Sequence, residues 1–214
     1  VHAAAAAVPA RDAQVVVVGA GPIGLVTALG LAQQGVRCVV LAAELQVCEG
    51  SRAIVFTRRS MEILQQVGVA EAIVAKGLPW RFGNSYYRGQ RVFRMEAPFP
   101  DDDRFGPLTN LQQQFVEQCL VEAIERQPLI ELRWGHKATR LVRNDAASKG
   151  VALEVATPHG VYEQSAQWVV AADGARSTLR TLAGLKLEGA AYEGRFVIAD
   201  IRIALPLPTE RLAY

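Results

Sequence analysis

The sequence is poor in the side chains that bind metals or form disulfide bonds. It contains three cysteines and three histidines, which are Cys38, Cys48, Cys119, His2, His136 and His159. The cysteines are far apart, odd in number and without CxxC spacing, so a reduced, cytoplasmic setting is favoured over a disulfide framework. The histidines are isolated along the chain, and we therefore expect no metal site.

The chain also has little excess charge of either sign. Its 214 residues carry a formal net charge of +2, and no run rich in Lys and Arg occurs. Such a charge is too small to indicate nucleic acid or an anionic membrane surface as a partner. Half of the residues are hydrophobic, which is enough for the buried core of one or two domains.

One uncharged run, Val15 to Ala32, is long enough to raise the question of a membrane span. It begins with four valines and then contains four glycines and Pro22. A buried strand over residues 14–18, a turn, and a helix over residues 22–34 explain this order better than one lipid-facing helix. A second strand is predicted over residues 36–41, and we expect no membrane span.

The turn between the first strand and the helix reads GAGPIG, with the glycine spacing typical of dinucleotide binding. Gly19 permits a tight exit from the strand, Gly21 leaves room for a pyrophosphate, and Gly24 lets the helix pack closely against the strand. Ala20 lies between the first two glycines, and Pro22 suits the first helical turn, which needs no N–H. The free N–H groups and the positive end of the helix would then face the phosphates.

The carboxylate that usually follows the second strand and binds the ribose is missing. Position 42 is Ala, and the nearest carboxylate is Glu44. In an extended chain, residues 42 and 44 point to the same side and lie about 6–7 Å apart. Glu44 would reach the ribose if the loop curls back, and it would otherwise be solvated. Both alternatives stay open, and Glu44 is retained as a candidate cofactor-binding residue.

Later segments have patterns of their own. Thr57 is expected to cap a helix with an apolar face of Met61, Ile63, Leu64 and Val67. Residues 109–124 read as a second helix with Phe115, Val116, Leu120 and Ile124 turned inward. Residues 80–98 read as a hairpin, residues 130–170 as a β-meander, and residues 195–205 as the first strand of a second sheet. A hydrophobic strand over Trp168–Ala172 runs into Asp173.

Together with GAGPIG, the stretches SRAI, NLQQ, ADGARS and YEGRFVIADIRIALPLP resemble the FAD-dependent aromatic hydroxylases. These are the single-component flavoprotein monooxygenases typified by p-hydroxybenzoate hydroxylase, and the likeness is greatest to 3-(3-hydroxyphenyl)propionate hydroxylase and its relatives. The resemblance implies an α/β, Rossmann-like FAD-binding fold with a parallel sheet, a β-meander and the start of a second, substrate-domain sheet.

The resemblance also implies a division of the chain. Residues 14–187 would form the FAD-binding domain, with a substrate-side hairpin near residues 80–98. Residues 188–214 would be the truncated start of a substrate domain. We interpret the Ala-rich residues 1–13 as a disordered tail.

Individual roles carry over from the family. The GAGPIG loop would hold the FAD pyrophosphate, and Arg52 matches an arginine on the pyrophosphate side, where its planar fork suits phosphate. Gln113 matches a glutamine that bonds the flavin side, with Gln112 as the alternative if the register differs by one. Asp173 matches the acid of the DG motif, which is implicated in both FAD and NAD(P)H binding.

Two features depart from the family pattern. Ala42 stands where the family has an acid, and the later Gly-Asp motif that closes around the flavin does not occur. The chain therefore resembles the N-terminal part of a longer enzyme.

The function implied by the resemblance is that of an FAD-dependent monooxygenase. NADH or NADPH would reduce the FAD, and oxygen would be inserted into a small phenolic substrate. No residue stands out as a catalytic base. One alternative is another oxidative reaction on the same fold, such as halogenation or polyketide tailoring. A second is a non-catalytic nucleotide-binding remnant, which Ala42 favours. The substrate, the choice of reductant and the oligomeric state stay open.

Overall fold

The computed structural model describes residues 13–50, 52–145, 150–190, 192–199, 201–204, 206 and 208–214. These residues form two compact units, which are described separately. The first unit holds residues 13–49 and 120–194, and the second holds residues 50–119 and 195–214. The division falls within helix α4 (Gln113–Glu125). The predicted tail lies outside the described residues except for Ala13, which begins the first strand.

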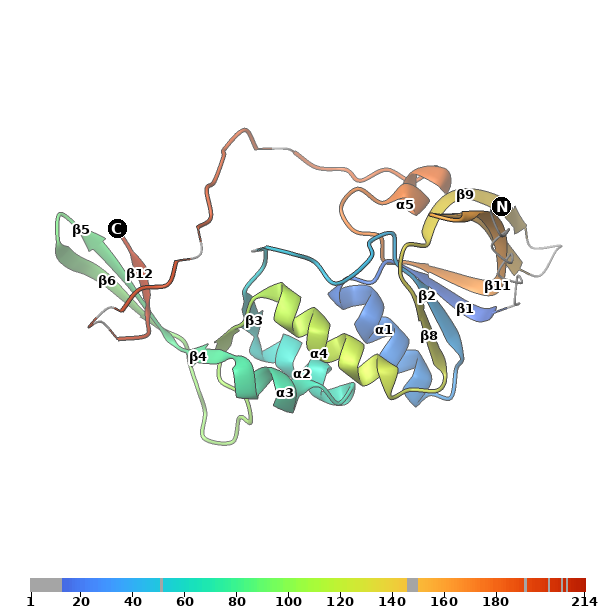
Figure 1. The fold of residues 1–214 in the computed structure, drawn as a ribbon. Helices are drawn as coiled ribbons and strands as arrows, with labels where there is room; N and C mark the ends of the chain where they lie inside the picture. The colour runs from blue at the N-terminus through green and yellow to red at the C-terminus, as the bar shows by residue number, and fades with distance from the viewer. Residues whose placement is uncertain are drawn as a thin grey trace, which may run out of the picture. The chain divides into compact units, whose positions relative to one another are not determined.

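The first unit is built on a six-stranded sheet with the order β8-β2-β1-β11-β10-β9 (Figure 1). Its strands are β1 (Ala13–Val18), β2 (Cys38–Leu41), β8 (Ile130–Arg133), β9 (Lys137–Asp145), β10 (Gly150–Thr157) and β11 (Gly160–Ala171). Strands β8, β2, β1 and β11 run parallel, and helix α1 (Pro22–Gln33) connects β1 to β2. This arrangement confirms the predicted strand, turn, helix and strand at the start of the chain.

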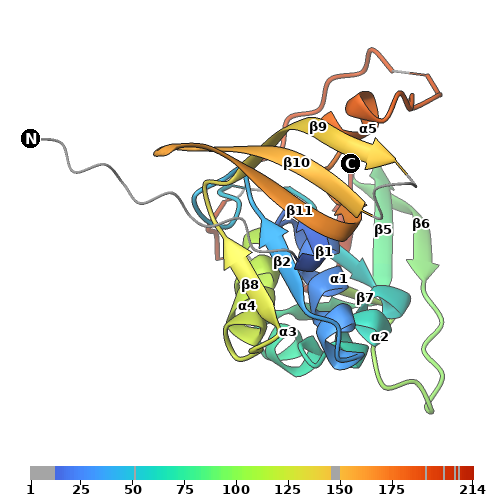
Figure 2. The same ribbon diagram turned by 90° about the vertical axis from the view of Figure 1, so that its right-hand side faces the viewer.

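Strand β11 belongs to two pairings along its length. Residues 160–166 pair antiparallel with β10, and residues 166–171 pair parallel with β1. Of the meander predicted over residues 130–170, β9, β10 and β11 are present and continuous with the parallel sheet, and Figure 2 shows them as a curved layer beside β1, β2 and β8. Residues 130–133 instead form β8, a strand of the parallel sheet itself. The last residue of β11 leads directly to Asp173, which places that residue at the carboxyl end of the parallel sheet.

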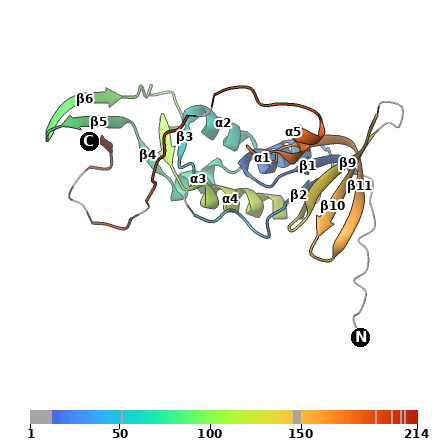
Figure 3. The same cartoon turned by 90° about the horizontal axis from the view of Figure 1, so that it is seen from above.

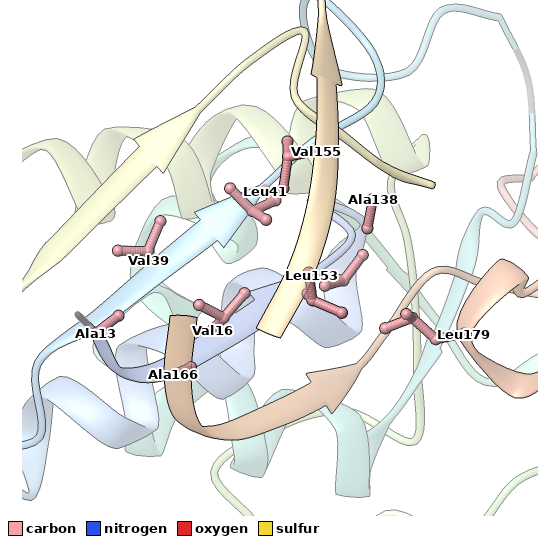
Figure 4. Close-up of a cluster of buried hydrophobic side chains, with 10 residues drawn as sticks. Ala13, Val16, Val39, Leu41, Ala138, Leu153, Val155, Ala166 and Leu179 are labelled. Atoms are coloured by element: carbon pink, nitrogen blue, oxygen red, sulfur yellow. The ribbon is translucent and has the colours of Figure 1, made fainter. Parts of the chain in front are cut away.

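A hydrophobic cluster joins the parallel strands to the meander (Figure 4). Val16 and Leu41 pack with Leu153 and Val155, and each of the four is fully buried. Burial of each such side chain contributes about 1.5–3 kcal/mol. The alternate residues of the strands are buried as well, since Val17 and Val40 are also fully buried. Burial on both faces explains the uninterrupted valine run of the sequence.

The helix α1 covers the other face of the sheet. Cys38 of β2 is fully buried and its thiol donates to the carbonyl oxygen of Ala28 in α1 at 3.9 Å. Burial raises the pKa of the Cys38 thiol to about 11. This cysteine therefore behaves as a small apolar side chain of the core.

Among the described residues, the second unit contains two three-stranded sheets, two complete helices and the first part of α4. One sheet has the order β3-β7-β4, formed by β3 (Val55–Thr57), β4 (Leu78–Trp80) and β7 (Leu108–Asn110). Helices α2 (Arg58–Gln66) and α3 (Ala70–Lys76) follow β3. Thr57 caps α2 as predicted, since its hydroxyl accepts the N–H of Ser60. Met61, Leu64 and Val67 are buried, whereas the inward placement of Ile63 was wrong, because 39% of it is exposed.

The other sheet has the order β12-β5-β6 (Figure 1), and Figure 3 shows its strands β5 and β6 side by side. Strands β5 (Phe82–Tyr87) and β6 (Gln90–Glu96) form the predicted hairpin, and β12 (Arg211–Ala213) pairs parallel with β5. The ring of Tyr86 stacks on that of Tyr214 at a centroid distance of 5.1 Å.

The prediction of a strand over residues 195–205 was wrong for the residues that the structure describes there. Residues 195–199 and 201–204 carry no strand, and Phe196 and Val197 are more than nine-tenths exposed. A strand needs a neighbour to pair its backbone N–H and C=O groups, and no pairing is formed by these residues. The second sheet takes its third strand from β12 instead.

Helix length bears on the question of a membrane span. Among the described residues, no helix combines the length and the apolar character needed to cross a bilayer. The uncharged run that raised this question is divided between β1, a turn and α1.

Candidate cofactor-binding site

The three glycines of the loop between β1 and α1 have different surroundings. Gly19 has a φ of +109°, and a Cβ atom there would overlap the carbonyl oxygen of Ala172. A Cβ atom on Gly24 would overlap the carbonyl oxygen of Gly19. The tight turn and the close helix packing expected from the sequence are therefore both present in the structure.

Gly21 differs because the space beside it is open. A Cβ atom built on Gly21 has no neighbour within 4 Å, and its φ of −75° suits any L-residue. Neither packing nor backbone strain therefore accounts for a glycine at this position. An open surface above bare backbone is what the approach of a pyrophosphate requires.

The N-terminus of α1 next to this loop is free of side-chain caps. Gly21 is the N-cap, Pro22 follows it, and no side chain accepts from the first turn. The first turn also carries no acidic residue. The 12-residue helix thus offers uncapped N–H groups and a positive dipole end of about half a charge, a suitable environment for phosphate.

Asp173 lies beside the glycine loop. The N–H of Ala172 donates to Val18 O at 2.8 Å, and the Cβ position of Gly19 falls 3.0 Å from the backbone N of Asp173. The Asp173 carboxylate accepts the hydroxyl of Ser177 at 2.5 Å and the N–H of Leu179 at 3.0 Å. Two of its acceptor positions are thus used to anchor α5 (Thr178–Leu182), and further acceptor positions stay available to a ligand.

Ser177 is a member of this corner that the sequence reasoning missed. It is 8% exposed, donates to Asp173, and accepts the N–H of Arg180 at 2.9 Å as the N-cap of α5. The signal was present in the sequence, because a serine directly before a short helical run is a typical N-cap.

A cavity of about 390 Å³ opens on the meander side of Asp173. Its walls are mostly apolar residues of β9, β10 and β11, with Asp173 and Arg180 among the polar ones. Phosphate needs a cluster of donors, so this cavity is not suited to the pyrophosphate.

Ala42 and Glu44 lie in a loop that is tied to the loop after β8. The N–H of Ala42 donates to Arg133 O at 2.9 Å, and Ala42 O accepts the N–H of His136 at 2.7 Å. Glu44 O accepts the N–H of Gly135 at 2.7 Å. Ala42 is fully buried, whereas the Glu44 side chain is exposed. Binding of the ribose by Glu44 stays a prediction.

A polar cluster links β8 and the residues just after it to the first half of β11. Arg133 is 7% exposed and donates to Glu131, to Tyr162 Oη at 3.1 Å and to Gln164 Oε1 at 2.8 Å. Burial opposes the charge of Arg133, but the bonds to Glu131 and Tyr162 outweigh it and raise the pKa of the guanidinium. His136 Nδ1 lies 2.9 Å from Tyr162 Oη. Burial, and then the charge of Arg133, lower the pKa of His136.

The other two predicted site residues, Arg52 and Gln113, belong to the second unit and lie on adjacent segments. Arg52 is exposed. The N–H of Gln113 donates to Ala53 O at 3.2 Å, and that of Leu111 to Ile54 O at 2.8 Å. The start of α4 is therefore fastened beside the segment that carries Arg52. The alternative residue Gln112 also lies at this start, where its carbonyl oxygen accepts the N–H of Phe115 at 3.0 Å.

No grouping of three metal-binding side chains occurs among the residues that the structure describes.

Comparison with known proteins identifies the family. Residues 12–211 match the model of a family described as FAD binding domain. Para-nitrophenol 4-monooxygenase of Pseudomonas sp. (strain WBC-3) is 31% identical over 193 residues, covering 87% of this chain and 46% of that protein. The 3-(3-hydroxy-phenyl)propionate/3-hydroxycinnamic acid hydroxylase of Mycolicibacterium smegmatis (strain ATCC 700084 / mc(2)155) is 32% identical over 189 residues, covering 87% of this chain and 33% of that protein.

The fold agrees with a solved structure of the same kind. The crystal structure of p-nitrophenol 4-monooxygenase from Pseudomonas putida DLL-E4 superposes with a TM-score of 0.78 and 33% identity, covering 85% of this chain and 46% of that one. The chain thus spans between a third and a half of the length of these relatives. With a match over nearly all its residues, it belongs to the family of FAD-binding domains.

Proposed function

We propose that this chain is the FAD-binding part of a flavoprotein monooxygenase that hydroxylates a phenolic substrate with NADH or NADPH as reductant. The observation that carries the proposal is the glycine loop, because Gly21 leaves open space above bare backbone at the uncapped end of α1. The phenolic substrate class is supported by two relatives, which are named as a nitrophenol monooxygenase and a hydroxyphenylpropionate hydroxylase.

Bound FAD would supply the redox chemistry, and the chain would supply its position and surroundings. The backbone of residues 19–24 would hold the pyrophosphate, with Ala20 and Pro22 shaping the loop. Asp173 would anchor α5 through Ser177 and Leu179 and offer its remaining acceptor positions to the nucleotide. Arg52 and Gln113 would be further cofactor contacts, and the exposed Glu44 is the candidate for the ribose.

Replacement of Gly21 by valine tests the proposal. We expect Gly21→Val to fold like the wild type, because a Cβ atom there has no neighbour within 4 Å, and to lose FAD, because the side chain would stand where the pyrophosphate approaches. Flavin content, read from the visible absorption of the purified protein, and the thermal midpoint of unfolding are the measurements.

The matched control is Gly30→Ala in the same helix, where a Cβ atom is equally free of neighbours. It should retain the wild-type flavin content. Undiminished flavin in Gly21→Val would contradict the assignment of the loop. A wild-type protein that takes up no flavin would favour the non-catalytic remnant. Phenol-dependent oxidation of NADH or NADPH by the flavin-loaded protein tests the reaction itself.

A further inference from the structure

Glu117 is a carboxylate buried in the helix that carries Gln113. It is 2% exposed and lies one turn after Gln113 in α4. The side-chain nitrogen Nε2 of Gln113 donates to Glu117 Oε1 at 2.7 Å. Burial of a carboxylate is costly unless hydrogen bonds compensate it, and the amide of Gln113 supplies one such bond.

The hydrogen bond fixes which end of the Gln113 amide faces outward. A carboxylate accepts hydrogen bonds, whereas an amide has one accepting oxygen and one donating nitrogen. Because Glu117 holds the nitrogen, Gln113 Oε1 is turned away from it. Gln113 is only partly buried, so this oxygen is within reach of a ligand.

The backbone of Gln113 is fixed as well. Its N–H donates to Ala53 O at 3.2 Å, which holds the start of α4 against the segment of Arg52. The amide is thus restrained at two points, by Ala53 through the main chain and by Glu117 through the side chain. Restraint of this kind removes rotamer entropy before a ligand arrives.

We propose that Glu117 is a positioning residue for FAD. It orients the side-chain amide of Gln113 so that Oε1 is presented as a hydrogen-bond acceptor to a donor on the flavin side of the nucleotide. This inference rests on the proposed function, since it requires that Gln113 contacts the cofactor. The donors that fit are the hydroxyl groups of the ribityl chain and the N–H of the flavin ring.

A double-mutant cycle in the purified protein tests the proposal. FAD is titrated into the wild type, Glu117→Gln, Gln113→Ala and the double variant. We expect Glu117→Gln to raise the dissociation constant about tenfold, the effect of one well-oriented hydrogen bond. In the Gln113→Ala background the same change should alter it less than about twofold, because the amide to be oriented is gone.

Two further measurements distinguish a changed orientation of the Gln113 amide from a loss of protein stability. The visible absorption band of bound flavin should change shape in Glu117→Gln and in Gln113→Ala alike. The exposed Glu122 of the same helix supplies the control, and Glu122→Gln should change neither the band nor the dissociation constant. An equal loss of affinity from Glu117→Gln in both backgrounds would overturn the proposal and leave the proposed function intact.

A reversed pair guards against a variant that simply fails to fold. The double variant Gln113→Glu/Glu117→Gln keeps an amide next to a carboxylate, so its thermal midpoint should match the wild type. The carboxylate introduced at position 113 still offers an accepting oxygen to the ligand, so we expect FAD affinity near that of the wild type. Loss of FAD binding by a reversed pair that folds like the wild type would refute the role of Gln113 as an oriented acceptor. Absence of FAD binding by the wild type would overturn the proposed function and this inference together.

Discussion

At the scale of single residues, Gly24 shows how closely α1 approaches the loop that precedes it. The carbonyl oxygen of Gly19 occupies the position that a Cβ atom would take, and the Ala172 side chain lies 3.4 Å away. A backbone oxygen cannot rotate aside as a flexible side chain can. The space between helix and strand therefore admits only a hydrogen atom at this position.

This contact predicts the stability of a pair of variants. We expect Gly24→Ala to lower the free energy of unfolding by about 3 kcal/mol or more, as overpacking against backbone does. Gly30→Ala in the same helix should raise it by about 0.5–1 kcal/mol, because alanine favours a helix and its Cβ atom meets nothing. Urea unfolding of the two variants is the measurement, and similar stabilities would show that the helix can shift to make room.

The glycines also mark the limit of what the sequence could predict at this scale. Their spacing was enough for the roles of Gly19 and Gly24, because the fingerprint is local. It gave no indication that Ala172, over 140 residues away in the chain, supplies the atom that Gly19 must avoid. Contacts of that kind depend on the pairing of β1 with β11, which no local pattern reports.

At the scale of elements, the short helix α5 depends on Asp173. A helix of five residues has little stability of its own, so its caps decide whether it forms. Asp173 accepts the N–H of Leu179 inside this helix and the hydroxyl of its N-cap Ser177. The residue predicted as a cofactor ligand thus also has a structural role.

Replacement of Asp173 by asparagine tests the role of its two carboxylate oxygens, which accept hydrogen bonds from Ser177 and Leu179. Asn retains one carbonyl oxygen, so Asp173→Asn should lose one of the two bonds and weaken α5 by about 1–2 kcal/mol. Faster hydrogen exchange of the Leu179 amide is the expected result. The exposed Asp101 gives the control, and Asp101→Asn should leave this exchange rate unchanged. Unchanged exchange in Asp173→Asn would mean that the rest of α5 holds the turn.

Helices and strands were predictable where the residues that determine them are adjacent in the sequence. The valine strand, the glycine turn and α1 are adjacent in sequence, and all three were found as expected. Residues 195–205 have an equally apolar pattern, yet those described form no strand, because a strand also needs a paired neighbour. Likewise, the link between Gln113 and Glu117 follows from i, i+4 spacing, but only the structure reveals that Glu117 is buried.

At the scale of the whole molecule, each compact unit is assembled from segments that are not consecutive in the chain. The first unit is assembled from residues 13–49 and 120–194, and the second takes the residues between them and the C-terminal segment. The division implied by the family resemblance has contiguous domains, whereas each compact unit combines separate stretches of the chain. Gly19, Gly21, Gly24 and Asp173 fall in the first unit, and Arg52 and Gln113 in the second.

The pH dependence of unfolding is a property of the whole chain to which His136 contributes. Its pKa in the folded protein is lowered from 6.5 by burial and by Arg133, so the folded state favours neutral imidazole. The unfolded chain binds the proton more readily, and the contribution of His136 to stability is therefore complete above pH 6.5. It is lost progressively as the pH falls below 6.5 toward the folded pKa.

Comparison of the wild type with His136→Gln tests whether His136 makes the free energy of unfolding decrease as the pH falls. We expect the wild type to lose free energy of unfolding faster than the variant between about pH 7 and pH 5, where unperturbed imidazole titrates. Urea unfolding at several pH values is the measurement, and the other titrating groups cancel in the difference. Parallel curves would show that His136 has the same proton affinity in both states.

Strand β11 fixes the distance between the turn that begins it and Asp173 beside the glycine loop. Its twelve residues run without interruption from the turn at Gly160 to the residue before Ala172, so the turn and Asp173 keep a constant separation. Lengthening the turn ahead of Gly160 leaves that separation untouched. A single residue inserted inside β11 would turn every later side chain of the strand to the opposite face of the sheet. Asp173 would then lose its hydrogen bonds to Ser177 and Leu179. We therefore expect insertions and deletions among members of this family to occur in the turns of the meander and not inside β11.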